Sequence, residues 1–320
     1  MVKEYRGLLC IGDPHLASNV PGFRKDDYPQ AILDKLAWSL NYAKEQALLP
    51  VILGDLFHWP RDNANRLLVQ VLELLEGVVL GIAGNHDCRE NELGADDALS
   101  VIWAAGRLRL LERSGPWCGN IGGRTVVIGG TAWGQALPVT FAPEEIGVLG
   151  NASLVVWLTH HDIRFPGYDE VGRFSPYEIP GVDIVVNGHI HRPLVDVLVG
   201  KTTWVNPGNI ARVRRSDADR NRRPSVLRIN VKKDGWDKEV VEVPFLPFER
   251  VFQEEVVSSD LPVDESMFVR GLAELERLKT HRGAGLRAFL DQNLGQFPDR
   301  VCKSSGTLPL TRCISRPSII

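Results

Sequence analysis

The feature that most limits the fold of this chain is an alternation of short apolar runs with longer segments of helical periodicity in its N-terminal part. The apolar runs at residues 7–11, 50–53 and 78–83 have the length of strands, and residues 28–48 and 63–75 have the spacing of amphipathic helices. A strand followed by a helix and a second strand usually forms a parallel pair. This order therefore predicts a parallel sheet built from βαβ units.

The second half of the chain has a different pattern. Closely spaced β-rich runs begin at about residue 126, with few helical segments between them. These runs are residues 126–128, 154–158, 182–186, 194–199, 202–205 and 226–231. They predict a second sheet or a mixed continuation of the first.

The C-terminal part changes character after Pro247. Asp264 can cap a helix that ends near Leu278, and residues 286–294 form a second, shorter candidate helix. Residues 298–320 are rich in Ser, Arg and Thr and show no periodicity. We therefore expect a main domain at residues 1–247, a helical appendage at 248–297 and a disordered tail at 298–320.

Composition excludes several classes of protein. The 320 residues are 44% apolar and 24% charged with a net charge of -3, which is typical of a globular protein. The longest uncharged stretch, residues 125–143, contains three glycines and two prolines, so we expect no membrane span. The N-terminus lacks the features of a signal peptide, and we expect a cytoplasmic location. Five cysteines without a C-x-x-C spacing predict free thiols rather than disulfides or a thiolate zinc site.

Histidines are placed unevenly along the chain. Seven of the eight lie in five short motifs, each directly after an expected strand. The motifs are Gly12-Asp13-Pro14-His15, Gly54-Asp55-Leu56-Phe57-His58, Gly84-Asn85-His86-Asp87, Thr159-His160-His161 and Gly188-His189-Ile190-His191. Because the carboxyl ends of strands in an open α/β sheet converge on one crevice, these motifs can share a single site.

The residue types in these motifs are those of a metal site. Asp, Asn and His are oxygen and nitrogen ligands suited to Mn, Fe and Zn. The pairs Asp13/His15 and His189/His191 are two residues apart, so both side chains of a pair can point to the same side of an extended loop. A single Asp after a strand is more often a turn residue, so the prediction depends on the whole series. Seven candidate ligands exceed the need of one ion and predict two, roughly 3.5 to 4 Å apart, with a shared carboxylate.

The charge of such a site indicates its substrate. Two divalent ions bring four positive charges, and two aspartates with a bridging hydroxide remove about three. The remaining charge of roughly +1 favours an anion such as a phosphate, and the ions would activate water for attack at neutral pH.

The five motifs in this order resemble the calcineurin-like metallophosphoesterase superfamily, over roughly residues 7 to 210. The resemblance implies an α/β fold with a two-sheet β-sandwich flanked by helices, in four α/β/β/α layers. It also implies two ligand sets that share one aspartate. The first set is Asp13, His15, Asp55 and His191, and the second is Asp55, Asn85, His160 and His189.

The same resemblance implies catalytic roles. His86, which follows the Asn ligand, would protonate or steady the leaving oxygen, and its neighbour Asp87 would orient it. His160 is preferred over His161 as a ligand because the family ligand usually comes first after the strand. The tandem leaves this assignment open.

The second motif favours one branch of the superfamily. His58, three residues after Asp55, resembles the SbcD-type DNA repair nucleases, in which a second histidine at this place assists DNA cleavage. The patterns G-D-x-V-D-R-G and G-N-H-E, expected of protein phosphatases, are not in the sequence. The alternative for His58 is a histidine that packs on Trp59 at the rim of the cleft.

A cluster of arginines follows the last ligand motif. Six arginines lie between residues 212 and 223, and Arg212, Arg214 and Arg215 are candidates for binding a nucleic-acid backbone. The alternative is a solvated loop. Phe57, Trp59 and Trp133 lie near the motifs and are candidates for stacking on bases.

Together these features predict a manganese-dependent phosphodiesterase that cleaves DNA, as an exonuclease or an endonuclease, with Fe, Zn or Mg as alternative ions. A small-molecule or cyclic-nucleotide phosphodiesterase or phosphatase is the competing enzyme. A scaffold subunit that recruits a partner through its C-terminal helix is the competing non-enzyme. Expected partners are DNA and, less directly, an SbcC-type ATPase or a second copy of the chain.

Overall fold

The computed structural model describes residues 4–147, 154–168 and 172–253. The chain divides into two compact units, Met1–Glu254 and Glu255–Ile320, and all described residues belong to the first. The expected C-terminal helices and tail lie outside the described residues. No helix of the described part is long and apolar enough to cross a membrane.

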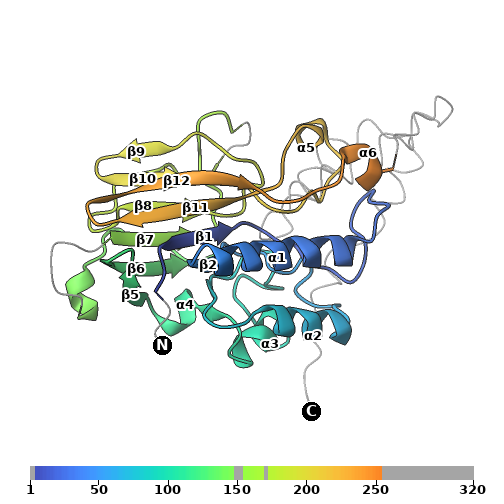
Figure 1. Ribbon diagram of the computed structural model, residues 1–320, viewed down its shortest axis with the longest axis horizontal. Helices are drawn as coiled ribbons and strands as arrows, with labels where there is room; N and C mark the ends of the chain where they lie inside the picture. The colour runs from blue at the N-terminus through green and yellow to red at the C-terminus, as the bar shows by residue number, and fades with distance from the viewer. Residues whose placement is uncertain (1–3, 148–153, 169–171, 254–320) are drawn as a thin grey trace, which may run out of the picture. The chain divides into compact units, whose positions relative to one another are not determined.

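The first of two six-stranded sheets has the strand order β12-β11-β1-β2-β3-β4 (Figure 1). Its strands are β1 (Gly7–Ile11), β2 (Leu48–Ile52), β3 (Leu80–Gly81), β4 (Arg109–Leu110), β11 (Ser225–Lys232) and β12 (Gly235–Glu242). Strands β1 to β4 are parallel, as the βαβ pattern predicts. The run at residues 226–231, predicted to belong to the second group of strands, joins the first sheet instead, because β11 pairs antiparallel with β1.

Helices α1 (Tyr28–Glu45), α2 (Asn65–Leu74) and α3 (Ala98–Ala104) cover the outer face of this sheet. The short α4 (Leu111–Ser114) packs instead against β6 of the second sheet, with Leu111 in the core between the sheets. The helix α1 begins at the cap residue Asp27, whose side chain accepts from the Gln30 amide. It ends before the expected residue 48, because Ala47 has a φ of 54° and turns the chain directly into β2. The helices α1 and α2 pack side by side (Figure 1).

The second sheet has the strand order β5-β6-β7-β8-β10-β9. Its strands are β5 (Trp117–Ile121), β6 (Arg124–Thr131), β7 (Leu154–Thr159), β8 (Ile184–Asn187), β9 (Val197–Val199) and β10 (Thr202–Val205). Strands β6, β7, β8 and β10 are mutually parallel. The sequence contains little sign of β5 and β12, which are edge strands with mostly exposed or half-buried residues.

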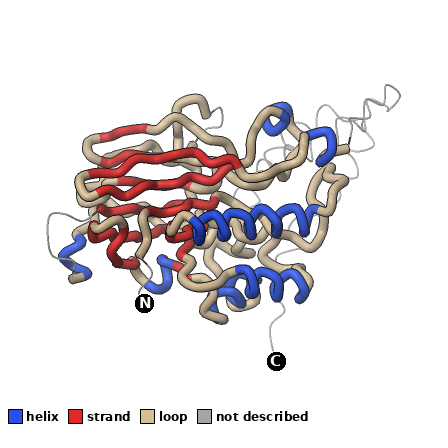
Figure 2. Tube along the Cα trace, in the orientation of Figure 1, coloured by secondary structure: helices blue, strands red, loops and turns tan. Residues whose placement is uncertain are grey.

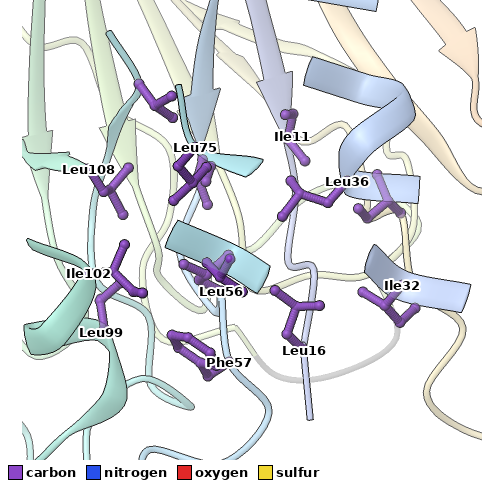
Figure 3. Packing of buried hydrophobic residues seen from close by; sticks show 14 of the residues in the cluster. Ile11, Leu16, Ile32, Leu36, Leu56, Phe57, Leu75, Leu99, Ile102 and Leu108 are labelled. Atoms are coloured by element: carbon purple, nitrogen blue, oxygen red, sulfur yellow. The ribbon is translucent and has the colours of Figure 1, made fainter. Parts of the chain in front are cut away.

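Alternating side chains bind the two sheets into a sandwich. In β1, Leu8 and Cys10 face the second sheet, whereas Leu9 and Ile11 face the helices. In β7, Val156 and its alternate neighbours face inward in the same way. Figure 3 shows the helix side, where Ile11 lies near Leu36 and Phe57 belongs to the same apolar cluster. The fold class that the family resemblance implies is therefore confirmed as a two-sheet α/β sandwich.

The outer face of the second sheet carries a third apolar cluster that includes Trp157 and Trp204. In the described residues it is covered mainly by segments from the long connections at residues 132–141 and 160–183, which are mostly loop (Figure 2). Three short helical turns complete the unit: η1 (Pro143–Ile146), α5 (Asp217–Arg220) and α6 (Phe248–Val251). The unit continues past Pro247, because Arg24 and Lys25 pair with residues at and after the end of α6.

Candidate metal centre

The five histidine motifs lie at the carboxyl ends of β1, β2, β3, β7 and β8. A backbone hydrogen bond joins the loop after β1 to the loop after β2, because the His15 amide donates to the Asp55 carbonyl at 2.9 Å. The loops of different sheets are also joined. The Asp13 carboxylate accepts from the His189 amide at 2.9 Å, and His160 Nδ1 donates to the Leu53 carbonyl at 2.7 Å. The two sheets therefore meet at a single site, as predicted.

The first predicted ligand set forms a compact group. One ligand atom from each of Asp13, His15, Asp55 and His191 lies within 4.8 Å of the others. His15 Nε2 is 2.9 Å from His191 Nε2 and 3.7 Å from Asp55 Oδ2. Asp13 Oδ2 is buried and has no hydrogen-bond partner among the described residues. A buried carboxylate oxygen in this position is open to a cation.

The second predicted set lies beside the first. His160 Nε2 is 3.3 Å from Asp55 Oδ2 and 3.1 Å from Asn85 Oδ1. His189 Nδ1 is 3.0 Å from the same Asn85 oxygen. Asp55 thus lies between the two groups and is the carboxylate that both can share.

The tandem histidines point in different directions. His160 has its Nδ1 on the Leu53 carbonyl, which turns Nε2 toward the ligand group. His161 Nε2 lies 2.8 Å from the Gln135 carbonyl, and its Nδ1 bonds to the hydroxyl of Thr159. The geometry therefore favours His160 as the ligand and gives His161 a structural position.

The ligand loops are strained. Among the described residues, six non-glycine residues have a positive φ, and four of them are predicted ligands. They are Asp13 (39°), His15 (53°), Asp55 (49°) and His189 (70°). Left-handed backbone costs roughly 1 to 3 kcal/mol per residue and persists where the surrounding structure enforces it. Gly84 packs closely against this part of the structure, because a Cβ at that position would collide with the Asp55 carboxylate.

Burial and charge give the two carboxylates different proton affinities. Burial raises the pKa of Asp13 to about 7, and the negative charge of Asp55 adds to this against the opposing effect of His160. For Asp55, burial also acts upward, but the fields of His160 and His86 and the bond from His160 hold its pKa well below the ordinary value. The shared carboxylate is therefore ionised, as a bridging ligand must be.

Burial and charge also shift the pKa values of the histidines in different directions. Burial lowers the pKa of His189 to about 3 and holds the pKa values of His15 and His191 well below the ordinary range. Burial opposes protonation of His160 too, but Asp55 and Asp13 raise its pKa to about 9. Three imidazoles are thus neutral and ready to ligate a cation. An ion that binds His160 would displace its proton, which would leave to solvent. The donor set, the open Asp13 oxygen and these charge states fit a pair of divalent ions.

His86 and His58 lie at the edge of this group. Their rings stack with centroids 5.0 Å apart and planes at 19°, and the His58 ring also packs edge-on against Trp59 at 4.6 Å. His86 Nδ1 donates to the His58 carbonyl at 2.8 Å. This bond fixes the tautomer and leaves His86 Nε2 as the nitrogen that can take or give a proton.

Asp87 does not have the expected position. Its buried carboxylate accepts from the backbone amides of Phe57 (2.9 Å), Leu56 (3.3 Å) and Gly84 (2.9 Å), and within the described residues no hydrogen bond joins it to the imidazole of His86. The expectation that Asp87 orients His86 is corrected: the His58 carbonyl does so, and Asp87 braces the β2 loop against the β3 loop.

A family model described as calcineurin-like phosphoesterase matches residues 7–193. The chain belongs to this family. The resemblance in the sequence is thereby confirmed at the level of the family, whose members are metal-dependent phosphoesterases. No curated protein matches the chain at a significant level.

Several solved structures are similar to the chain of this phosphoesterase. A hypothetical protein from Thermus thermophilus matches 74% of this chain and 99% of its own, with 13% identity and a TM-score of 0.40. Sulfate thiohydrolase SoxB of the same organism matches 92% of this chain and 59% of its own, with 13% identity and a TM-score of 0.38. NAD nucleotidase NadN of Haemophilus influenzae matches 91% of this chain and 60% of its own, with 10% identity and a TM-score of 0.40.

The arginine-rich segment after β10 differs from the expectation. Residues 209–213 are buried and irregular, and four successive carbonyl oxygens accept from arginine and lysine side chains. These bonds run from Arg222 to Asn209 (3.0 Å) and Ala211, from Lys35 to Ile210 (2.9 Å) and from Arg24 to Arg212. The Ile210 amide in turn donates to the Gly12 carbonyl at 3.1 Å, next to the ligand Asp13. No short motif signals this arrangement in the sequence.

Arg212 is corrected as a substrate-binding residue. It is 3% exposed, and its guanidinium donates to the carbonyls of Arg222 and Leu246. Its donors are therefore used within the fold. Arg215 is half-buried over the Phe23 ring, and Arg214 is exposed.

The candidate stacking residues also differ from one another. Phe57 is fully buried in the helix-side core, which rules it out as a base-stacking residue (Figure 3). Trp59 is 39% exposed beside His58. Trp133 is half-buried with its ring 4.9 Å from that of His189. An indole thus flanks each side of the histidine cluster.

Proposed function

We propose that this phosphoesterase hydrolyses DNA phosphodiester bonds with two divalent ions, manganese being the native pair, in the manner of the SbcD-type nucleases. The observation that carries the proposal is the stacked pair of His58 and His86 beside the two ligand groups. When bound, the ions would activate water and draw charge from the phosphoryl oxygens.

A diester of DNA makes a particular demand on the protein. Its leaving group is a sugar alkoxide, which is too basic to depart without a proton. His86 has its Nδ1 bonded to the His58 carbonyl, so its Nε2 is the atom that delivers this proton. A general acid in this role contributes about 10² to 10⁴ in rate.

His58 is proposed to contact the substrate beside His86. It is only 9% exposed and packs between His86 and Trp59, so its position is fixed on two sides. The packing on Trp59 expected as an alternative role is therefore present, and it is compatible with the catalytic one. Trp59, at the outer side of the pair, is proposed to stack on a base.

The substrate strand is proposed to continue along the loop after β10, where Arg214 is exposed and Arg215 is half-buried on Phe23. DNA is thus the proposed partner. The SbcC-type ATPase and the homodimer stay predictions that depend on the C-terminal residues outside the described part.

The test compares leaving groups. The full chain with manganese is incubated with end-labelled single- and double-stranded DNA, with a cyclic nucleotide, and with bis(p-nitrophenyl) phosphate, whose phenolate departs without a proton. We expect cleavage of DNA. We also expect His86→Ala to lower DNA cleavage by about 10² to 10⁴ while changing nitrophenyl release far less and leaving bound manganese unchanged.

His58→Gln should lower DNA cleavage with little effect on the nitrophenyl ester, and the matched control His161→Gln should affect neither reaction. Rapid hydrolysis of the cyclic nucleotide with intact DNA would instead identify a small-molecule phosphodiesterase. Absence of hydrolysis with every substrate, in a protein that holds both ions, would favour the scaffold function.

A further inference from the structure

Helix α1 reaches the loop after β1 through two polar side chains on its buried face. Tyr28 lies in the first turn and is fully buried, and its hydroxyl donates to the carbonyl of the predicted ligand His15 at 2.6 Å. Lys35 lies two turns further along the same face and is 9% exposed. Neither residue belongs to the five histidine motifs.

Lys35 contacts the loop after β1 through an intermediate residue. Its Nζ donates to the Ile210 carbonyl at 2.9 Å, and the Ile210 amide donates to the Gly12 carbonyl at 3.1 Å. The two segments are in close contact, because a Cβ at Gly12 would collide with the Gly208 carbonyl. Gly12 directly precedes the predicted ligand Asp13, so a shift of Ile210 would be transmitted to that ligand.

The two bonds therefore lie on either side of a strained turn. Asp13 and His15 have φ values of 39° and 53°, and the bonded carbonyls are those of Gly12, before the turn, and His15, at its end. A residue other than glycine keeps a left-handed conformation only where its surroundings enforce it. The bonds that originate from α1 supply such a constraint at both ends of the turn.

The burial of Lys35 needs an explanation of its own. Lysine is seldom so deeply buried, because its amine loses hydration there. Burial and then the nearby guanidinium groups lower the pKa of Lys35 to about 7. A methionine would fill a similar volume without this cost. What the amine adds is the bond to the Ile210 carbonyl, so the segment held by that bond accounts for the lysine.

We propose that Tyr28 and Lys35 are positioning residues that hold the Asp13-Pro14-His15 turn in the conformation that binds the first ion. Tyr28 holds the end of the turn directly, and Lys35 holds its beginning through Ile210. The proposal rests on the two-ion site of the proposed function but not on the ester that is cleaved. Loss of either bond lowers the fraction of the protein with a competent turn, and the apparent metal affinity falls by the same factor.

Manganese titration of the full chain tests the proposal without a substrate. Asn85→Ala removes a ligand of the second set only, and His191→Ala removes a ligand of the first set only, so each variant keeps one complete set. Tyr28→Phe or Lys35→Met is then added to each of them. Calorimetry should show manganese binding weakened about tenfold in the Asn85→Ala protein and by less than about twofold in the His191→Ala protein.

Two control variants on α1 separate positioning from a general loss of stability. Tyr42→Phe removes a hydroxyl that accepts from Arg228 at 3.3 Å, near the other end of the helix. Ile32→Val removes one carbon from the same buried face without removing a hydrogen bond. Neither control should change manganese affinity.

Three results of the titration would overturn the proposal. The first is an equal loss of affinity in the Asn85→Ala and His191→Ala proteins. The second is a loss of similar size with Ile32→Val. The third is an unchanged affinity of the first set in either Tyr28→Phe or Lys35→Met.

The metal dependence of hydrolysis gives a second measurement. Because binding selects the competent turn, saturating manganese should restore bis(p-nitrophenyl) phosphate hydrolysis by Tyr28→Phe to within about twofold of the wild-type rate. The manganese concentration for half-maximal rate should rise about tenfold. A lower maximal rate with an unchanged manganese requirement would contradict a positioning role. Since no DNA is present, a protein that binds manganese but leaves DNA intact rejects the nuclease proposal alone.

Discussion

The metal centre at the strand ends and the segment after β10 both contain dense clusters of functional residue types, and the fold uses them in opposite ways. At the metal centre, side chains from five loops converge and Asp13 Oδ2 is buried with no partner in the described residues. In the segment after β10, the donors of Arg212 and Arg222 are bonded to backbone carbonyls and, for Nε of Arg222, to the Asp219 carboxylate. A cluster therefore marks a binding site only where bonding capacity is left for a ligand.

The largest expected difference between the two regions comes from Asp55, the one carboxylate that both ligand groups share. Asp55→Asn should prevent tight binding of both manganese ions and lower hydrolysis of any phosphoester below detection, because the neutral amide cannot bridge two cations. Metal analysis of the purified protein and hydrolysis of bis(p-nitrophenyl) phosphate measure this. Asp96→Asn is the control, since the Asp96 side chain is 81% exposed. Retention of both ions by Asp55→Asn would contradict the assignment.

A smaller but systematic effect should appear in the pH dependence of metal binding. The pKa values of Asp13 and His160 are raised, to about 7 and about 9, so each group holds a proton below its pKa that a metal ion must displace. Manganese affinity should therefore rise from pH 6 to pH 9, by about tenfold per pH unit for each proton displaced. Calorimetry in buffers of different ionisation enthalpy measures the protons released. An affinity that is flat over this range would show that neither group is a ligand.

The contrast between the regions also explains what the sequence could and could not predict. The ligand loops were predictable because buried parallel strands read as short apolar runs, and polar residues at their ends must meet at one edge. The role of Arg212 was not predictable, because a guanidinium on an irregular segment binds phosphate or a carbonyl depending on where the chain runs in three dimensions. The prediction for Asp87 was wrong for the same reason, since the hydrogen-bond partners of its carboxylate are backbone amides up to 31 residues away.

Edge strands were the other part of the fold that the sequence pattern did not predict. β12 has the sequence GWDKEVVE, and within the described part of the chain it pairs with β11 alone. Its charged residues suit an edge that must not pair with other chains, and they remove the apolar alternation by which a strand is recognised. Interior strands such as β7, with six consecutive buried residues, present no such difficulty.

Stability should separate Arg212 from Arg214 although the two are close in sequence. Arg212→Ala removes a buried guanidinium, its bonds to the carbonyls of Arg222 and Leu246 and its contact with the Phe245 ring, 4.7 Å away. It should lower the free energy of unfolding by about 3 kcal/mol, whereas exposed Arg214→Ala should change it by less than about 0.5 kcal/mol. Urea denaturation of the two variants measures the difference. Equal stabilities would show that Arg212 is not part of the internal bonding of this segment.

The smallest expected effect is on substrate binding. Here Arg214 should matter more than Arg212, which is the reverse of their order for stability. If the strand passes along the loop after β10, Arg214→Ala should weaken DNA binding several-fold at low salt and reduce the slope of log affinity against log salt by about one. Binding is measured by fluorescence anisotropy with labelled DNA and calcium in place of manganese, to prevent cleavage. Arg223→Ala is the matched control, because Arg223 is also exposed but is paired with Glu242 at 2.8 Å. A guanidinium already neutralised by a carboxylate contributes little to holding a phosphate. A salt slope unchanged by Arg214→Ala, or lowered equally by Arg223→Ala, would show that the strand does not pass along the loop after β10.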